Sequence, residues 1–372
     1  MKEQAGVAYH YKGSVENQAA LADIQNPAVG DVYNALDTGM NFGWNGTEWD
    51  NLGAFVDLSP YALDKDIQPI PEETIKSLIY SGKYSVVNDA EGIKGMFNND
   101  NAEVEIALAD DVVAETVLSI PAGKSVVLNL NDKELSGAGD YTLAVQGDLT
   151  LKGGSITNDG YRAIQVLNGG SLTVDGTNIT AERDCAIEVS GAGSNVIVNG
   201  GTITAQEVPV LAVTGASAVI NGGHLIGLDN FAIGGNGSQG QGDSNVTING
   251  GIIEGRIQSA GYIAAAIYWP NSGALTINGG EIISEGAGIV QRAGTVVIND
   301  GAKITANGAS GVLGKVGDSK VTVGPYAVVY DKSANYPASG TMSLNIASGA
   351  QLEGTDGDLQ ILGDGSAITD NR

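Results

Sequence analysis

Two carboxylates, Glu207 and Asp229, are the residues whose spacing most directly suggests chemistry. Each lies eight residues after the same point of a repeated motif, so stacked repeats would place them one repeat apart. Two carboxyl groups about 5 to 10 Å apart can hydrolyse a glycosidic bond. Glu182 and Asp184 occupy the matching segment of the preceding repeat. Because acidic residues occur here at ordinary density, we favour a solvated acidic rim and expect no catalytic residues.

No other group forms a catalytic or metal-binding pattern. A lyase would need clustered acids for Ca²⁺ beside a basic residue, and the basic residues after residue 110 are scattered. His224 has no Ser, Cys or second His near it in the sequence, which favours a surface histidine. Cys185, the single cysteine, is expected in the core, and Gly234–Gly242 lacks the Gly-Lys-Ser/Thr ending of a phosphate loop. We therefore expect no metal and no cofactor.

The candidate residues above lie within a sequence repeat whose copies are spaced 21 to 29 residues apart. Its centre is two or three β-formers followed by Asn-Gly-Gly, as in NVTINGGIIEG, which starts at Asn245. Such a drifting period is typical of a solenoid whose coils differ in loop length. The residues before the turn glycine are Asn131, Lys152, Asp175, Asn199, Asn221, Asn249, Asn278, Asn299 and Gly324, with a weaker copy near Ala347.

Within one repeat the pattern predicts two short strands, a tight corner and a third strand. In SLTVDGTNIT, Leu172, Val174 and Ile179 alternate with polar residues and are expected to point inward. The glycines supply positive φ at the corner without steric cost. Equivalent asparagines would stack coil upon coil with their amides hydrogen bonded in a ladder. The repeat therefore predicts a parallel β-helix.

The segment before the repeats predicts a helix that caps the first coil. Asp89 is a plausible N-cap for the stretch Asp89–Asp100, which presents an apolar face of Ile93, Met96 and Phe97. The following VLSIPAGKSVVLNLNDKELSG resembles the first coils of right-handed β-helices of the pectin-lyase-like superfamily. The resemblance covers about residues 85–372. It implies an all-β fold with a right-handed parallel β-helix of about ten coils, a helix-capped start at 85–110 and a shaft at 111–372.

The first 60 residues contain many aromatic residues and no copy of the repeat. The sequence GDVYNALDTGMNFGWNGTEWDNLGAFVDLS predicts three short strands, with turns at Asp-Thr-Gly and Asn-Gly. So small a module has little else to bury than its aromatic side chains. Its expected core is Tyr33, Phe42, Trp44 and Trp49.

The same stretch resembles the N-terminal segment of phage head fibre proteins and related tail-fibre modules. The match runs over about residues 8–58, from YHYKGSV to GWNGTEWDNLG. It implies a homotrimer (a dimer is the second choice) fixed to the capsid or another virion protein by a module at 1–58, with Tyr11 among its aromatics. Residues 59–84, rich in proline, are expected to form a stiff linker that contains a short helix from Glu72 to Ile79.

One aromatic group on the shaft is a candidate glycan contact: Tyr262, Tyr268 and Trp269. They lie in one of the two longest repeats, and aromatic faces are common in sugar-binding surfaces. Packing within the loop or between neighbouring shafts is the alternative that we favour.

Composition limits the possible partners. The net charge is −25, which would repel a polyphosphate backbone, so nucleic-acid binding is not expected. No apolar run is long enough to span a membrane and the first residues do not resemble a signal peptide. The resemblance to phage head fibre proteins, taken with these limits, implies a structural virion protein made in the host cytoplasm, a head fibre on the capsid surface that adheres to host-surface or mucosal glycans. The alternatives are a tailspike-like polysaccharide depolymerase and, third, a bacterial surface adhesin.

Overall fold

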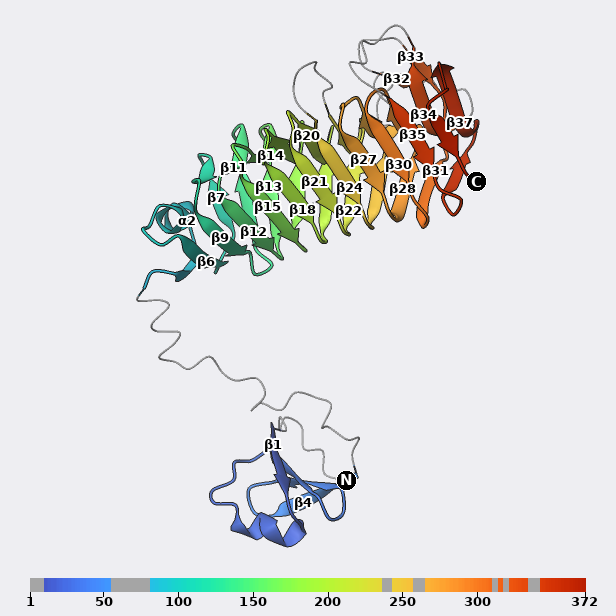
Figure 1. The fold of residues 1–372 in the computed structure, drawn as a ribbon. Helices are drawn as coiled ribbons and strands as arrows, with labels where there is room; N and C mark the ends of the chain where they lie inside the picture. The colour runs from blue at the N-terminus through green and yellow to red at the C-terminus, as the bar shows by residue number, and fades with distance from the viewer. Residues whose placement is uncertain are drawn as a thin grey trace. The chain divides into compact units, whose positions relative to one another are not determined.

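The structure, a computed structural model, describes residues 10–54, 81–235, 243–256, 265–309, 314–316, 321–333 and 342–372. The chain divides into two compact units, residues 1–78 and 79–372 (Figure 1). Most of the expected linker at 59–84, including a helix expected from Glu72 to Ile79, lies outside the described residues.

The N-terminal unit contains a four-stranded mixed sheet in the order β1-β2-β3-β4. β1 pairs with β2 in parallel, and the other two pairs are antiparallel. The three strands predicted by the sequence are β2, β3 and β4, and the glycines of the two predicted turns, Gly39 and Gly46, have φ of 67° and 101°. The strands and the short 3-10 helix η1 are β1 (His10–Val15), η1 (Gln18–Asp23), β2 (Asp31–Ala35), β3 (Met40–Trp44) and β4 (Trp49–Ala54).

The second unit is a right-handed parallel β-helix built from three long sheets (Figure 1). Every pair of neighbouring strands within these sheets is parallel, and successive coils pair in register, as in Leu149 with Leu172 and Leu172 with Val196. Two of the sheets have 10 strands each and the third has 12. The predicted fold is confirmed.

We call the 12-stranded sheet the first sheet and the two 10-stranded sheets the second and third sheets, in the order in which the chain visits them. The first sheet consists of β5 (Tyr84–Val87), β6 (Glu103–Leu108), β9 (Ser125–Asn129), β12 (Asp148–Lys152), β15 (Ser171–Asp175), β18 (Asn195–Val198), β21 (Ser217–Ile220), β24 (Asn245–Ile248), β27 (Ala274–Ile277), β30 (Thr295–Ile298), β35 (Ser343–Ile346) and β38 (Ile368–Asp370). The second consists of β7 (Val112–Ala114), β10 (Glu134–Gly137), β13 (Ser155–Asn158), β16 (Asn178–Ala181), β19 (Thr202–Ala205), β22 (His224–Gly227), β25 (Ile252–Gly255), β28 (Gly280–Ser284), β31 (Ala302–Ala306) and β36 (Gln351–Gly354). The third consists of β8 (Leu118–Ile120), β11 (Tyr141–Val145), β14 (Arg162–Val166), β17 (Ile187–Ser190), β20 (Val210–Val213), β23 (Ile233–Gly234), β26 (Ala265–Trp269), β29 (Ala287–Gln291), β34 (Tyr326–Lys332) and β37 (Gly357–Gly363).

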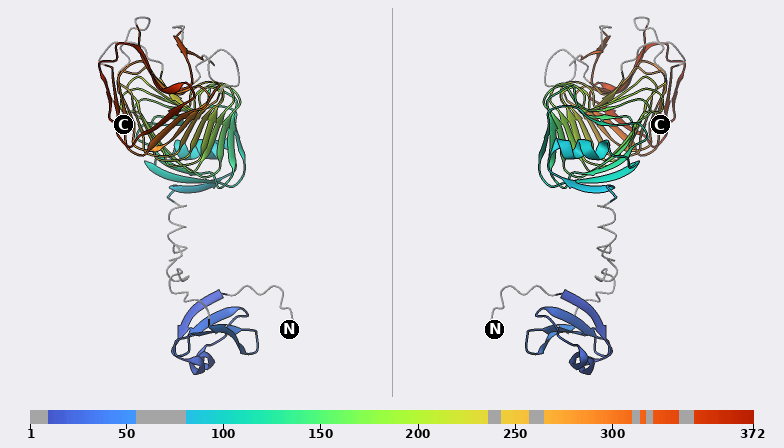
Figure 2. Two further views of the ribbon diagram at one scale, coloured as in Figure 1. Left: turned by 90° about the vertical axis from the view of Figure 1, so that its right-hand side faces the viewer. Right: turned by 90° about the vertical axis from the view of Figure 1, so that its left-hand side faces the viewer.

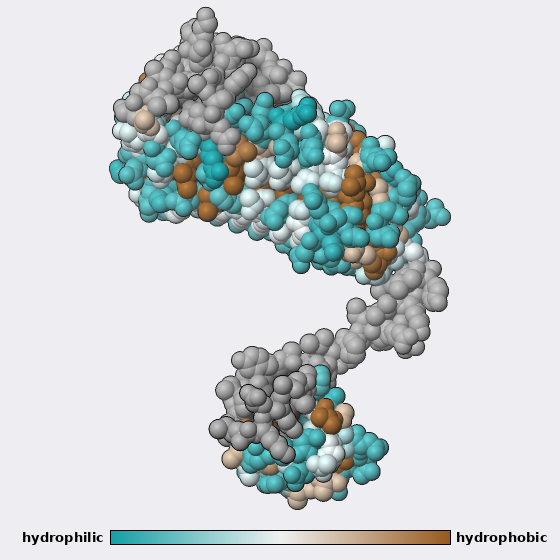
Figure 3. All heavy atoms as spheres, turned by 180° about the vertical axis from the view of Figure 1, so that it is seen from behind, coloured by the Kyte–Doolittle hydropathy of each residue, from teal (hydrophilic) through white to brown (hydrophobic). Residues whose placement is uncertain are grey.

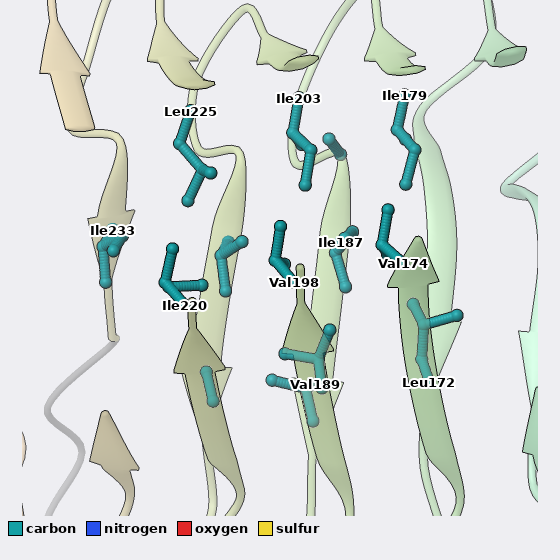
Figure 4. Close-up of a cluster of buried hydrophobic side chains, with 14 of the residues drawn as sticks. Leu172, Val174, Ile179, Ile187, Val189, Val198, Ile203, Ile220, Leu225 and Ile233 are labelled. Atoms are coloured by element: carbon teal, nitrogen blue, oxygen red, sulfur yellow. The ribbon is translucent and has the colours of Figure 1, made fainter. Parts of the chain in front are cut away.

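The interior of the solenoid is a column of aliphatic side chains. Leu172, Val174 and Ile179 are fully buried, as their alternation predicts. Figure 4 shows the same arrangement from coil to coil, with valine, leucine and isoleucine of successive strands stacked at equivalent positions. Burial of this apolar area, at about 25 cal/mol per Å², is the main force that holds one coil on the next.

Helix α2 (Ala90–Phe97) covers the N-terminal end of this column. The Asp89 carboxylate accepts a hydrogen bond from the Gly92 N–H (2.7 Å), which confirms the predicted N-cap. The expected apolar face is buried: Ile93, Met96 and Phe97. Figure 2 shows α2 lying across the end of the coils. Without such a cover the first coil would expose its interior to water.

The repeated Asn-Gly-Gly segments form the corner between the first and second sheets. The second glycine has positive φ at each of these corners, for example 94° at Gly201 and 87° at Gly251. The predicted ladder is present, because each asparagine Nδ2 donates to the Oδ1 of the asparagine one coil earlier at 2.7 to 2.9 Å. The ladder runs through Asn199, Asn221, Asn249, Asn278 and Asn299.

We expect Gly201→Ala to lower the free energy of unfolding by about 1 kcal/mol or more. Its φ is 94°, and an added Cβ would lie 2.1 Å from the Thr177 carbonyl oxygen. The neighbouring Gly200 is the matched control, since a Cβ there meets nothing closer than 3.8 Å. Chemical denaturation of both variants measures the difference. Equal stability of the two would show that the corner does not depend on positive φ.

One predicted corner is wrong. Gly324 precedes β34 in the third sheet, and the corner that follows Asn299 in the stack is near Ala347, where Ala347 N–H donates to the Ile298 carbonyl (2.8 Å). The cause is an insertion between β31 and β34 that contains an antiparallel pair, β32 (Gly314–Val316) and β33 (Val321–Val323). The Val-Thr-Val-Gly sequence at the end of this insertion resembles the repeat, which explains the incorrect prediction at Gly324.

The outer surface of the described residues is mostly hydrophilic on the face shown in Figure 3, with apolar residues in small separate patches. On the outer side of the third sheet, however, a second apolar cluster is buried. It comprises Cys185, Val208, Phe231, Ala265, Tyr268, Ala287, Val290 and Val329.

Candidate functional site

Glu207 and Asp229 lie on adjacent coils, in the loops that join the second sheet to the third. The Asp229 N–H donates to the Gln206 carbonyl (3.0 Å), and Gln206 Nε2 donates to Asp229 Oδ2 (3.1 Å). The Glu207 N–H donates to the Asp184 carbonyl of the preceding coil (3.3 Å). The spacing in the sequence therefore places three acidic residues on three consecutive loops.

The surroundings of Glu207 shift the titration of its carboxyl group. Although Glu207 is exposed as a residue, partial burial of its carboxyl group raises its pKa, and the negative charge of Asp184 adds to this effect. The positive charge of Arg162 acts in the opposite direction. A raised pKa is a property that a general acid requires.

Arg162 is the centre of a network that crosses three coils. Its Nε donates to Asp184 Oδ2 (2.6 Å) and its Nη1 forms an ion pair with Glu188. The Tyr141 hydroxyl donates to Glu188 Oε2 (3.0 Å) and accepts from Arg162 Nη1 (3.2 Å). Burial and the nearby Glu188 raise the pKa of Tyr141 to about 12. Asp184 and Glu188 are therefore engaged in holding a guanidinium group.

The parallel register explains why these side chains meet. Tyr141 and Arg162 are paired at the first positions of β11 and β14, and Gln165 of β14 pairs with Glu188 of β17. The side chains of Tyr141, Arg162 and Glu188 meet beside the third sheet, where coils are about 4.8 Å apart. A long arginine side chain spans that distance and reaches the carboxylates of the next coil.

Cys185 does not act as a nucleophile here. Its Sγ donates to Asp184 Oδ1 (3.1 Å), and the side chain is buried in the outer apolar cluster. Burial raises the pKa of the Cys185 thiol well above its ordinary value, and Asp184 adds to the shift. A thiol held in the neutral form reacts slowly. Cys185 is thus a core residue, as its sequence context predicts.

A shallow groove lies beside the Arg162 network, at the same edge of the solenoid. Its volume is about 750 Å³. It is formed by the loops of three consecutive coils, and its lining residues are Ala138, Gly139, Asp140, Asp159, Gly160, Tyr161 and Arg183. A Cβ on Gly160 would lie 2.2 Å from the Ala138 carbonyl oxygen. The absence of a side chain at this glycine thus allows the loops to stack closely.

Tyr161 is the exposed aromatic residue of the groove. Its side chain is 45% exposed, and the Arg162 Cζ lies 4.6 Å from its ring centroid. A hydrogen bond with Asp184 raises the pKa of the Tyr161 hydroxyl. One part of the ring is thus fixed by the network while the rest faces solvent.

The aromatic group expected to contact glycan is not arranged for that role. Trp269 is fully buried in the interior of the solenoid, and Tyr268 is 7% exposed and packs against Phe231 with ring centroids 5.3 Å apart. Tyr262 lies outside the described residues. Strand β26 is covered on both faces, so its aromatic residues serve packing, which is the alternative that the sequence favoured. Trp269 has no exposed surface for the candidate glycan contact.

Sequence reasoning missed Tyr141, Tyr161 and Arg162. In the sequence Tyr141 and Tyr161 are 20 residues apart and do not form a cluster. That separation is close to one period of the repeat, which is the signal that would have placed them on adjacent coils.

The aromatic residues expected in the N-terminal module do come together. Phe42 is buried, Tyr33 and Trp49 pack against the same core, and Trp44 contacts Trp49 with ring centroids 5.2 Å apart. Trp49 Nε1 also donates to the Leu21 carbonyl of η1 (3.1 Å). Helix η1 was not predicted, and its Leu21 completes the core.

Tyr11 lies apart from this core, on β1 at the edge of the sheet. Its hydroxyl is 3.0 Å from Ser14 Oγ. The tyrosine is half-buried.

His224 is paired with a carboxylate on the outer side of the second sheet. Its Nε2 lies 2.7 Å from Glu254 Oε2, and Arg256 Nε donates to Glu254 Oε1 (2.6 Å). Arg256, and then His224, lower the pKa of Glu254 despite its partial burial. Each oxygen of the Glu254 carboxylate therefore has a partner, His224 on one and Arg256 on the other.

Within the described residues, no group of three or more His, Cys, Asp or Glu side chains has a metal-binding arrangement. In the same part of the chain no helix has the length and apolar character needed to cross a bilayer. No protein-family model matches the sequence, and neither the curated proteins nor the solved structures contain a significant match.

Proposed function

We propose that the protein is a phage head fibre: a structural virion protein of the capsid surface that adheres to host-surface or mucosal glycans and is not an enzyme. The resemblance of residues 8–58 to the N-terminal segment of such fibres carries the proposal. The separation of the chain into two units supports it, because a fibre needs one part for attachment and another that projects.

The properties of the two units suit these roles. The N-terminal unit is small, and its core contains a few aromatic residues. Two apolar side chains of this unit are exposed to solvent, Leu36 at 67% and Val29 at 52%. Apolar surface of this kind is common where a protein meets a partner. The β-helix repeats one packing unit along its length, so it forms a stiff shaft whose loops can vary without loss of stability.

We expect residues 1–58 to attach the chain to the particle and to hold a homotrimer, with a dimer as the second choice. Purified full-length chain should decorate fibreless capsids in electron micrographs, whereas a chain lacking residues 1–58 should fold but fail to decorate them. Trp49→Ala should act like the deletion because it removes much of a very small core. Light scattering should show the full chain as a trimer and the truncated chain as a monomer. Decoration by the truncated chain would contradict the proposal.

A depolymerase is the second candidate, and the raised pKa of Glu207 beside Asp184 and Asp229 favours it. A general acid with a raised pKa and a second carboxylate are the parts that glycoside hydrolysis requires. Release of reducing sugar from bacterial surface polysaccharide, abolished by Glu207→Gln or Asp229→Asn, would replace the binding function with an enzymatic one.

A further inference from the structure

The groove beside Arg162 offers an aromatic surface whose position is fixed before any ligand arrives. Tyr161 is 45% exposed and rests against the Arg162 guanidinium, which is itself held by Asp184 and Glu188. Ordering a flexible side chain costs free energy on binding, and a ring that is already fixed avoids that cost. Tyr161 is therefore prepared to receive a flat apolar surface.

The other groups of the groove are those that recognise hydroxyls. Asp140 and Asp159 are exposed carboxylates, which accept hydrogen bonds, and Arg183 is an exposed donor. Gly139 and Gly160 contribute only backbone to the floor. The groove thus combines one aromatic ring with a few polar groups, which suits a ligand with an apolar face and polar groups at its edge. A sugar ring has these two properties.

The charge of the groove indicates which sugars fit. Its lining contains two carboxylates and one guanidinium, and the whole chain has a net charge of −25. A uronic or sialic acid would meet like charge both at long range and on contact. A neutral hexose or N-acetylhexosamine would not.

We propose that the loops 138–140 and 159–161, together with Arg183, bind a neutral glycan, with the apolar face of one sugar ring packed on Tyr161 and hydroxyls bonded to Asp140, Asp159 and Arg183. The inference rests on the proposed adhesive function and gives that function a site and a ligand class. It replaces β26 as the glycan-contacting surface.

Titration calorimetry of the full-length chain tests the site with three probes: chitotetraose, mannotetraose and an α2,8-linked sialic acid tetramer. At least one neutral tetramer should bind with a Kd of about 1 mM or tighter, and the sialic acid tetramer should bind at least about tenfold more weakly. Tyr161→Ala should weaken neutral binding about tenfold or more, whereas Tyr161→Phe should stay within about threefold, because it keeps the ring. Val113→Ala, at a 69% exposed position on β7, is the matched control and should leave the Kd for the neutral tetramers unchanged.

Three results would overturn the site: no binding of either neutral tetramer at about 10 mM, unchanged binding by Tyr161→Ala, or equal binding of the sialic acid tetramer. None of them depends on attachment to a particle. Conversely, if the full chain binds a neutral tetramer through Tyr161 but never decorates capsids, the site stands and the fibre proposal fails. Tyr161→Ala should decorate capsids like the unmodified chain.

Discussion

Asp331→Ala is expected to lower the free energy of unfolding by about 3–5 kcal/mol, because it removes one partner of a buried ion pair. Asp331 Oδ2 lies 3.1 Å from Arg292 Nε, and both side chains are fully excluded from solvent. Asp331 Oδ1 also accepts a hydrogen bond from the Ser333 N–H (3.0 Å). The substitution leaves the Arg292 guanidinium buried without this carboxylate.

The double variant Arg292→Met/Asp331→Leu distinguishes the effect of losing the ion pair from the effect of the cavity that alanine creates. It removes both charges while keeping apolar volume, so it should cost much less than Asp331→Ala and is expected to come within about 1–2 kcal/mol of the unmodified chain. Chemical denaturation gives the free energies. Hydrogen exchange of β29 and β34 shows whether the loss is local, as expected in a solenoid whose coils contact only their neighbours. A loss below about 1 kcal/mol for Asp331→Ala would mean that water or other groups compensate the charge.

Trp269→Ala should cost about 3–5 kcal/mol, the range for removing a large buried aromatic side chain. The Trp269 indole is fully buried in the aliphatic column, and its Nε1 has no hydrogen-bond partner within the described residues. The alanine variant leaves a cavity that the flanking coils cannot close. Trp269→Phe should cost clearly less, because it fills most of the volume and removes the unsatisfied N–H.

The same pair of variants decides between the two roles of β26. If Trp269 serves packing, Trp269→Ala shifts the thermal midpoint, while Trp269→Phe leaves glycan binding unchanged in the tetramer titrations. A folded Trp269→Ala chain with an unchanged thermal midpoint but no glycan binding would restore the contact role that the sequence suggested.

The sequence alone determined the repeated parts of the molecule. The Asn-Gly-Gly corners, the inward Leu172, Val174 and Ile179, and the Asp89 cap all follow from local preferences: positive φ for glycine, alternation in a strand and an acceptor before a helix. The amide ladder through Asn249 followed as well, because a constant period puts like residues on top of one another.

The tertiary structure decided everything that depends on contacts across coils of unequal length. The insertion before β34 displaced the corner expected at Gly324. The outer apolar cluster covered Tyr268, which an alternating pattern would have left exposed. The Arg162 network and the Tyr161 groove join residues from three coils, and their composition depends on the register of parallel strands and on loop shape. A period fixes which strands are neighbours, but only the folded loops fix which side chains meet between them.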